Sequence, residues 1–381
     1  MYDVTPQLPK NGFTAAELFC GGGLMGVGLK TSGFNIVWAN DFERNAVKAY
    51  RHNLGDHVIH ADITAIDPKD IPDVDVIAGG PPCQDYSVAG KGEGEKGERG
   101  RLVFAYLDII KAKQPKAFLF ENVKGLVSKK HRHTFDKLLE EFNRIGYTVS
   151  WKVLNAWDYG VAQKRERVFI VGVRNDLGFS FVFPEPEPED YRTQVLRDVI
   201  GDLPEPRMDE RNPEDGQYSS RYLSRNRVVS WDAPSYTILT SPRDTPIHPG
   251  DGTVTMEDVR NHRPRELFYP NHDRLPVSAF RSYKFDASNR GAKWGEPSVT
   301  LRANTVSGQP WHPDKYEVGM VPRRFTVREC LRIQSAPDWY VLPDDISLSA
   351  QYRIVGNGVP CRVAWYLGRA LADQLKEVRR R

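Results

Sequence analysis

The chain has 381 residues, of which 40% are apolar and 27% charged, and its formal net charge is only +3. This composition is that of a globular protein, and the length suits a full hydrophobic core divided between two domains. The sequence contains no apolar run of about 18 residues, the length a membrane-spanning helix needs, so we expect no membrane partner. The small net charge does not by itself indicate a nucleic-acid-binding protein.

Strand and helix patterns alternate through the first half of the chain. Short apolar runs predict strands at 15–19, 35–39, 74–78, 117–120, 147–154 and 168–173. Helical patterns predict helices at 23–30, 43–51, 102–113, 134–145, 325–334 and 359–378. Strands that alternate with helices predict an α/β fold with a doubly wound, mostly parallel sheet.

A stretch of alternating proline and glutamate interrupts this pattern at 184–190, where the composition favours a semi-rigid extended spacer. We take it as the boundary between an α/β core (1–183) and a second, smaller domain (190–320). The second domain is rich in turn residues and is expected to be irregular and mostly β. Helical patterns return near the C-terminus, so we expect residues 321–381 to rejoin the core.

The second domain contains an internal duplication. An Asn-Arg, Trp, Pro-Ser, Thr-Ile pattern in residues 226–238 recurs in residues 289–301, with leucine in place of isoleucine. We expect each copy to form one short strand, with Trp231 or Trp294 packed inward, and the two copies to have similar backbones. A repeat that serves only packing is the alternative.

Motifs rich in polar residues follow the ends of several expected strands, which is where open α/β sheets carry their chemistry. They are Pro81-Pro82-Cys83-Gln84, Glu121-Asn122-Val123, Gln163-Lys164-Arg165-Glu166-Arg167 and, near the C-terminus, Gly356-Asn357-Gly358-Val359-Pro360. Together with a glycine turn at 21–23, and in this order, they resemble the motifs of the DNA cytosine-C5 methyltransferase family. The resemblance covers roughly residues 13–175 and 321–365.

The resemblance implies S-adenosylmethionine as the cofactor. The implied cofactor-binding residues are Phe19, Gly21, Gly23, Asp41, Phe42, Asp62 and Asn357. Glycines let the backbone approach a ligand at a helix N-terminus, and an acidic residue after the second strand accepts hydrogen bonds from ribose hydroxyls. Phe42 is expected to stack on adenine, and Asp62 to reach its amino group. The glycine turn alone would also suit a nicotinamide cofactor, but Pro81-Pro82-Cys83-Gln84 argues against that reading.

The resemblance also implies a covalent mechanism on cytosine, whose C5 atom is a poor nucleophile. Cys83 is the expected nucleophile that adds to C6, and Glu121 the acid that shares a proton with N3. Arg165 and Arg167 alternate on the run into a strand and are expected to hold the base and brace the Cys83 loop. The other three cysteines, which form no Cys-x-x-Cys pair, are expected to be small buried hydrophobes: Cys20, Cys330 and Cys361. We expect a reducing intracellular setting and no metal site.

Substrate-binding roles are further implied for Gln84, Ser87 and Asn122. Residues 85–100 contain glycines at five positions among charged residues and are expected to form a mobile lid over a flipped base. A loop without a role is the alternative.

Arginines take the place of lysines over residues 165–283, which include much of the second domain. No lysine occurs between Lys164 and Lys284, whereas residues 165–283 carry 16 arginines, whose planar forks can bind guanine edges and phosphates. The loops 240–248 and 302–312 are expected to face DNA, with Arg243 and Arg302 in contact with it. Codon bias combined with a solvated surface is the alternative explanation.

We therefore expect a methyltransferase that acts on one cytosine of a short duplex DNA sequence by base flipping. Its likeliest setting is the bacterial cytoplasm, associated with the nucleoid, as a monomeric modification enzyme with or without a separate restriction nuclease. An RNA cytosine-C5 methyltransferase and a catalytically inactive DNA-binding regulator of the same fold are the alternatives. The long segment between Arg167 and residue 325 favours a reader of duplex DNA, because such a domain is needed to reach base edges in a groove.

Overall fold

The structure is a computed structural model that describes residues 10–82, 100–203, 229, 232–238, 240 and 325–379. The chain divides into two compact units. The first, here called the α/β unit, comprises residues 1–203, 234–240 and 328–381, and the second, the inserted unit, comprises 204–233 and 241–327. Most of the inserted unit lies outside the described residues, including Trp231, Trp294 and the whole second copy of the duplication.

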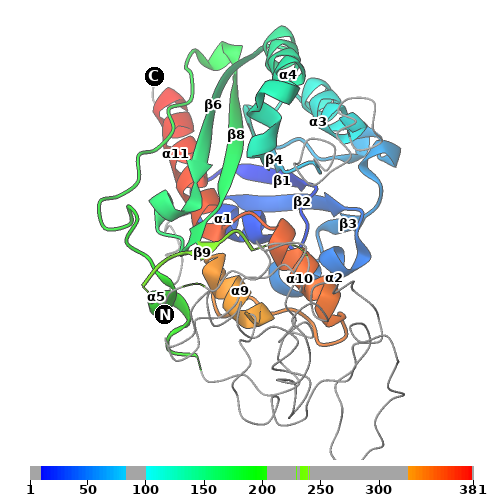
Figure 1. Ribbon diagram of the computed structural model, residues 1–381. Helices are drawn as coiled ribbons and strands as arrows, with labels where there is room; N and C mark the ends of the chain where they lie inside the picture. Colours follow the sequence, from blue (N-terminus) through cyan, green and yellow to red (C-terminus); the bar gives the residue numbers. More distant parts are fainter. Residues whose placement is uncertain are drawn as a thin grey trace, which may run out of the picture. The chain divides into compact units, whose positions relative to one another are not determined.

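A seven-stranded sheet forms the centre of the α/β unit, with the strand order β3-β2-β1-β4-β5-β8-β6 (Figure 1). Its strands are β1 (Thr14–Leu18), β2 (Asn35–Asp41), β3 (Val58–His60), β4 (Val76–Gly79), β5 (Ala117–Val123), β6 (Tyr147–Asn155) and β8 (Glu166–Arg174). The first five strands pair in parallel, and β8 runs antiparallel to both β5 and β6. The prediction of a mostly parallel, doubly wound sheet is confirmed.

Helices cover both faces of this sheet. They are α1 (Leu24–Thr31), α2 (Arg44–Leu54), α3 (Gly100–Lys113), α4 (Arg132–Arg144), α5 (Leu196–Ile200), α9 (Val327–Ile333), α10 (Leu348–Asn357) and α11 (Cys361–Arg379). Helices α3 and α4 lie on one side, and α1 with α11 on the other (Figure 1). Shorter elements complete the unit: 3-10 helices η1 (Ile63–Ala65), η2 (Pro68–Asp70), η5 (Lys124–Val127), η6 (Lys129–His131), η7 (Ala156–Tyr159) and η8 (Asn175–Leu177), and strands β7 (Gln163–Lys164) and β9 (Ser235–Tyr236).

Aromatic side chains fill the core between the sheet and helices α3 and α4. The rings of Phe118 and Phe142 lie 4.3 Å apart, and Tyr106 packs edge-on against Phe120 at 5.3 Å. The buried Tyr106 hydroxyl donates to a backbone carbonyl of β4 and one of β5, each at 3.1 Å. A buried tyrosine needs such a partner, and here the bonds also tie β4 and β5 together from the side of α3.

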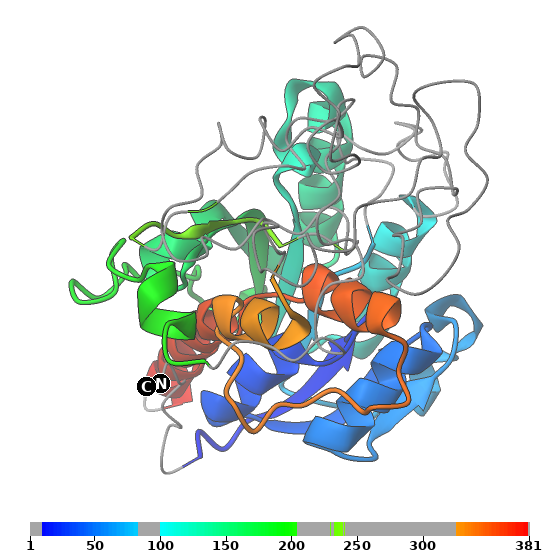
Figure 2. The ribbon, with the colours of Figure 1, turned by 60° about the horizontal axis from the view of Figure 1, so that its bottom comes forward.

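The C-terminal segment returns to the glycine-rich beginning of the unit. Helix α10 packs on α2 through Ala46, Ala49, Ala350 and Ile354, and the two helices lie side by side in Figure 2. The Tyr340 hydroxyl donates to the Gly22 carbonyl at 2.6 Å. Residues that meet only in the folded chain therefore support the turn between β1 and α1.

The proline-rich stretch 184–190 is docked on the α/β unit rather than forming a free spacer. Tyr159 donates to the Pro184 carbonyl at 3.1 Å, and Asp190 accepts hydrogen bonds from Arg362 and Tyr366 of α11. The boundary expected at this stretch therefore falls inside the unit, which continues to residue 203. Composition alone could not reveal these partners, which come from distant parts of the chain.

In the described part of the chain, no helix is both long and apolar enough to cross a membrane.

Candidate active site

The carboxyl ends of β4 and β5 lie side by side because the strands pair in parallel, with Gly79 opposite Phe120. The residues that follow this pair along the chain are Gly80, directly after β4, and Glu121, near the carboxyl end of β5. A Cβ atom on Gly80 would lie only 2.9 Å from Glu121 Oε2. A glycine is therefore needed for the Glu121 carboxyl to occupy this edge of the sheet.

Asn122 ties the two strand ends together. Its Nδ2 donates to the Pro81 carbonyl at 3.3 Å, and its Oδ1 accepts the backbone N–H of Val123 at 2.8 Å. The side chain is buried, so both ends of the amide are engaged by the protein. The structure thus places Asn122 as a brace at the start of the segment that leads to Cys83. Cys83, Gln84, Ser87 and the expected lid up to residue 99 lie outside the described residues.

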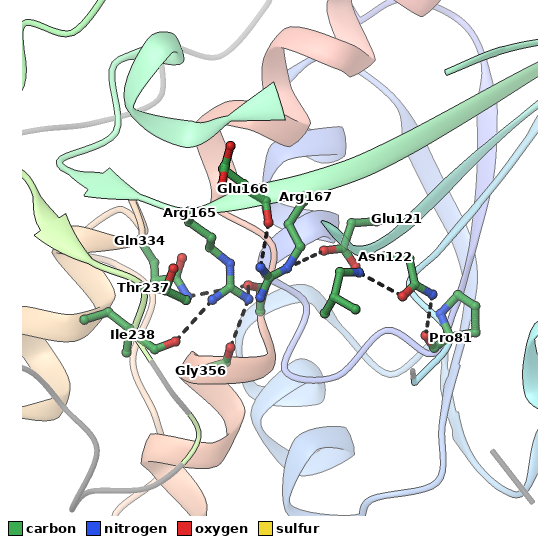
Figure 3. A network of polar contacts seen from close by, with 12 residues as sticks. Pro81, Glu121, Asn122, Arg165, Glu166, Arg167, Thr237, Ile238, Gln334 and Gly356 are labelled. Carbon is green, nitrogen blue, oxygen red and sulfur yellow. Dashed lines mark hydrogen bonds and ion pairs between the residues drawn. The ribbon is translucent and has the colours of Figure 1, made fainter. Parts of the chain in front are cut away.

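Arg167 pairs with the buried Glu121. Arg167 Nε lies 3.1 Å from Glu121 Oε1, and Arg167 Nη1 donates to the Glu166 carbonyl at 2.8 Å (Figure 3). The antiparallel register of β5 and β8 brings the two residues to the same end of the strand pair. Burial raises the pKa of Glu121 above its ordinary value, while the charges of Arg167 and Arg165 oppose part of that rise. The site therefore favours a carboxyl group that can hold or share a proton.

Arg165 is engaged differently, although its side chain leaves the same side of the strand as that of Arg167 (Figure 3). It is 2% exposed. Its Nη2 donates to the carbonyls of Gly356 and Gly358, each at 3.0 Å, and its Nη1 donates to the carbonyl of Ile238 at 3.2 Å. Arg165 thus binds three backbone carbonyls, an arrangement that the sequence did not indicate.

The glycine turn between β1 and α1 contains three expected cofactor-binding residues in the left-handed region: Phe19 (φ 53°), Gly21 (φ 55°) and Gly23 (φ 87°). The Gly21 N–H donates to Asp41 Oδ2 at 2.7 Å, and the Glu43 N–H donates to Asp41 Oδ1 at 2.8 Å. Burial raises the pKa of Asp41, and these N–H groups oppose that rise. Among the described residues other than Gly21 and its two chain neighbours, none places an atom within 4 Å of the position that a Cβ on Gly21 would take, so the turn has free space beside it.

The other expected cofactor-binding residues end or follow neighbouring elements. Phe42, directly after β2, is 73% exposed. Asp62 follows β3, is exposed, and caps η1 through Oδ1, which accepts the N–H and the hydroxyl of Thr64. Asn357 is the exposed last residue of α10, between the two glycines whose carbonyls Arg165 binds.

These groups fit a ligand with a ribose, a purine and an amino-acid end. A backbone turn with space beside it, a carboxylate at the end of β2 and an exposed aromatic ring follow one another along one edge of the sheet. Such an order is what a nucleoside cofactor requires in an open α/β sheet.

Glu17 was not singled out in the sequence, and Gly358 and Gln163 were named there only as members of motifs, without a role of their own. Glu17 is buried in β1 beneath the glycine turn, and a charged residue inside an apolar strand was the available signal. Gly358 lies against Leu24, where a Cβ would be 2.3 Å from Leu24 Cδ1. Gln163 is fully buried and binds the backbone of Ile238. The last two contacts join segments about 75 residues or more apart and leave no local signature.

Comparison with known proteins gives relatives along nearly the whole chain. The family model for C-5 cytosine-specific DNA methylases matches residues 13–373. Type II methyltransferase M.MthTI of Methanothermobacter thermautotrophicus is 37% identical over 377 residues, covering 95% of this chain and 98% of the relative. Type II methyltransferase M.FnuDI of Fusobacterium nucleatum is 34% identical, covering 95% and 94%.

Solved structures share the fold at lower identity. The S. pombe Dnmt2 methyltransferase superposes with a TM-score of 0.63 at 17% identity, covering 96% of this chain and 98% of that one. A putative DNA modification methyltransferase encoded within an E. coli prophage gives a TM-score of 0.59 at 20% identity, covering 96% and 100%. The family match over residues 13–373 and the sequence relatives together show that the chain belongs to the C-5 cytosine-specific DNA methylases and is a DNA (cytosine-5-)-methyltransferase.

Proposed function

We propose that this protein transfers a methyl group from S-adenosylmethionine to C5 of one cytosine within a short duplex DNA sequence. The observation that carries the proposal is the position of the buried Glu121. Its carboxyl group pairs with Arg167 and lies against Gly80, and Gly80 is three residues before Cys83 in the sequence. This combination supplies an acid with a raised pKa beside the segment that bears the expected nucleophile.

The proposed reaction begins with addition of the Cys83 thiolate to C6 of cytosine. The new S–C6 bond moves electron density to C5 and N3, and Glu121 holds a proton at N3 to stabilise the developing charge. When bound, the cofactor would supply a methyl group on a positively charged sulfur: C5 bonds to the methyl carbon as the methyl–sulfur bond breaks, and S-adenosylhomocysteine leaves. The N3 proton returns to Glu121, solvent takes the C5 proton, and the S–C6 bond breaks to restore the C5–C6 double bond and the Cys83 thiolate.

Arg167 and Asn122 have supporting roles in this scheme. Arg167 fixes the orientation of the Glu121 carboxyl, and its remaining donors suit the O2 atom of a cytosine held against Glu121. Asn122 holds the Pro81 carbonyl and so limits the positions open to the Cys83 segment. The target base must leave the duplex to reach groups this deeply set, which supports base flipping.

For the cofactor, we assign the methionine end to the turn at Gly21 and Gly23, the ribose to Asp41 and the adenine to Phe42, Asp62 and the Asn357 turn. The free space at Gly21 and the 73% exposure of Phe42 support this assignment. The sequence relatives named above are type II methyltransferases, which supports a modification enzyme of a restriction-modification system, acting beside a separate nuclease. We assign the inserted unit, with Arg243 and Arg302, to target recognition.

A 5-fluorocytosine duplex tests this function directly. Fluorine at C5 cannot leave as a proton does, so the wild-type protein should form a denaturation-resistant adduct that maps to Cys83. Cys83→Ala should give no adduct and no turnover, whereas Cys330→Ala, which removes a buried thiol of the same size, should retain both. An adduct on another cysteine, or normal turnover by Cys83→Ala, would contradict the mechanism.

Glu121→Gln separates catalysis from binding. We expect it to slow methyl transfer far more than it weakens DNA binding, because the interaction with N3 strengthens in the transition state. Equal losses in rate and in affinity would make Glu121 a structural residue.

A further inference from the structure

A short segment of the chain belongs to the α/β unit although its neighbours on both sides belong to the inserted unit. Residues 234–240 lie in the α/β unit, whereas residues 204–233 and 241–327 form the inserted unit. Within this segment, of which only residue 239 is not described, Pro234–Ile238 is the Pro-Ser-x-Thr-Ile step of the first copy of the duplication. The first copy does form a short strand, as expected, and that strand is β9.

Backbone and side-chain hydrogen bonds fasten this segment to the Gln163–Arg167 motif. Strand β9 pairs in parallel with β7, and the Ser235 N–H donates to the Ala162 carbonyl at 2.7 Å. Two residues on, the Thr237 hydroxyl donates to the Lys164 carbonyl at 2.9 Å. The hydroxyl of Ser235, by contrast, donates to the carbonyl of its own neighbour, Tyr236.

The peptide groups of Ile238 are held by two side chains of the same motif. Gln163 Oε1 accepts the Ile238 N–H at 3.2 Å. Arg165 Nη1 donates to the Ile238 carbonyl at 3.2 Å (Figure 3). Both Gln163 and Ile238 are fully buried. Buried peptide groups require partners, so these side chains continue the ladder where the strand pairing stops.

The same motif reaches the two other parts of the site. Arg165 Nη2 binds the carbonyls that flank Asn357, and Arg167 pairs with Glu121. The five consecutive residues 163–167 therefore hold three parts of the site. These are the segment Pro234–Ile238, the turn at Asn357 and the acid Glu121. A displacement of Ile238 cannot occur without breaking its bonds to Gln163 and Arg165, which directly precede β8, the strand that carries Arg167.

We propose that Gln163 and Arg165 are positioning residues that dock Pro234–Ile238 on β7 and the residue that follows it, and thereby fix where the chain leaves the α/β unit for the target-recognition region and returns from it. This inference rests on the function proposed above. Accurate placement matters because small errors in the position of a reacting group cost large factors in rate. The loss falls mainly on the correct target, which alone makes full use of the accurate placement, so a loosened docking lowers discrimination.

The docking also distinguishes the two copies of the duplication. The second copy carries the same hydroxyl side chains, Ser298 and Thr300, but β7 offers only one set of partners for such a segment. The first copy pairs with β7 and serves as the anchor, whereas the second copy lies outside the described residues.

A matched pair of hydroxyl deletions tests the proposal. Thr237→Val removes the hydroxyl that reaches the Lys164 carbonyl, and Ser235→Ala removes a hydroxyl of the same segment that reaches only Tyr236. Bisulfite sequencing of plasmid from cells that express the wild type first defines the methylated site. The kcat/KM value is then measured on a duplex that contains this site and on duplexes with one base pair of the site altered.

We expect Thr237→Val to lower the ratio of kcat/KM on the methylated site to kcat/KM on an altered duplex by roughly 2- to 10-fold, which corresponds to the loss of one hydrogen bond, with only a small fall in melting temperature. Ser235→Ala should leave the ratio unchanged. Gln163→Leu should lower it further, and Gln163→Glu, which retains an acceptor for the Ile238 N–H, should recover part of the loss.

Two outcomes would overturn this inference without affecting the proposed function. One is an unchanged ratio in both Thr237→Val and Gln163→Leu. The other is a fall in Ser235→Ala as large as that in Thr237→Val. Each requires a wild type that methylates cytosine normally. A wild type that produces no 5-methylcytosine would overturn the proposed function and this inference together, so the two failures are distinguishable.

Discussion

Glu17 gives the sharpest prediction about stability, because it is a carboxyl group buried in the centre of the sheet. The side chain is 1% exposed, and its Oε1 accepts the Gly26 N–H at 3.1 Å. Burial raises its pKa to about 8 from the ordinary 4.5, and hydrogen bonds from Gly26 and Tyr50 oppose only part of that rise. The folded protein therefore keeps a proton on Glu17 at neutral pH that the unfolded chain releases.

The direction of the pH dependence follows from this difference. Between pH 4.5 and about 8 the folded state binds one proton more than the unfolded state, so the free energy of unfolding falls as the pH rises. The fall from this group is about 1.4 kcal/mol per pH unit, or roughly 5 kcal/mol across the window. Glu17→Gln removes this dependence and retains an acceptor for the Gly26 N–H. The variant should gain stability over the wild type by several kcal/mol between pH 5 and pH 8.

Urea denaturation at a series of pH values measures this gain. The unfolding free energy of Glu17→Gln minus that of the wild type should rise steadily from pH 5 to pH 8. Glu140→Gln, on the exposed face of α4, removes a carboxylate that is not buried and serves as the control. A difference between Glu17→Gln and the wild type that does not change with pH would refute the reasoning.

Three further substitutions probe the contacts around the site. Gly358→Ala would place a Cβ 2.3 Å from Leu24 Cδ1 and should cost about 1–3 kcal/mol in thermal unfolding, less when combined with Leu24→Ala. Asp190→Ala would leave Arg362 without its buried partner and should cost about 3–5 kcal/mol in urea denaturation. Phe42→Ala, at a side chain 73% exposed, should leave the melting temperature unchanged but weaken binding of S-adenosylhomocysteine by about 1–3 kcal/mol in calorimetry. Unchanged affinity in that variant would remove Phe42 from the cofactor site.

Periodicity and turn chemistry were sufficient to predict the first half of the α/β unit. The helix expected at 23–30 is α1 at Leu24–Thr31, and the strand expected at 117–120 is β5 at Ala117–Val123. The strand ends carry the expected motif residues because apolar runs stop where the chain leaves the buried sheet. Local sequence contains this information, since burial on both faces requires unbroken apolar runs.

Contacts between distant segments could not be predicted in the same way. Helix α10, at Leu348–Asn357, was not expected, and its buried face is defined by α2 rather than by its own pattern. The pairing of β9 with β7 involves two residues on each strand, too few for any period to be recognised. The antiparallel placement of β8, which brings Arg167 to Glu121, depends on strand order in the folded sheet.

Arg165 and Arg167 illustrate why a motif fixes chemistry more closely than it fixes roles. The two arginines are two residues apart and leave the same side of the chain, so sequence reasoning assigned them one task (Figure 3). Arg167 meets a carboxyl group, whereas Arg165 meets three carbonyl oxygens from two segments that arrive much later in the chain. A planar guanidinium can bind separate oxygens in fixed directions, and an ammonium group cannot reproduce that geometry. The residue type is set by the number and directions of its partners, and those partners become visible only when the chain has folded.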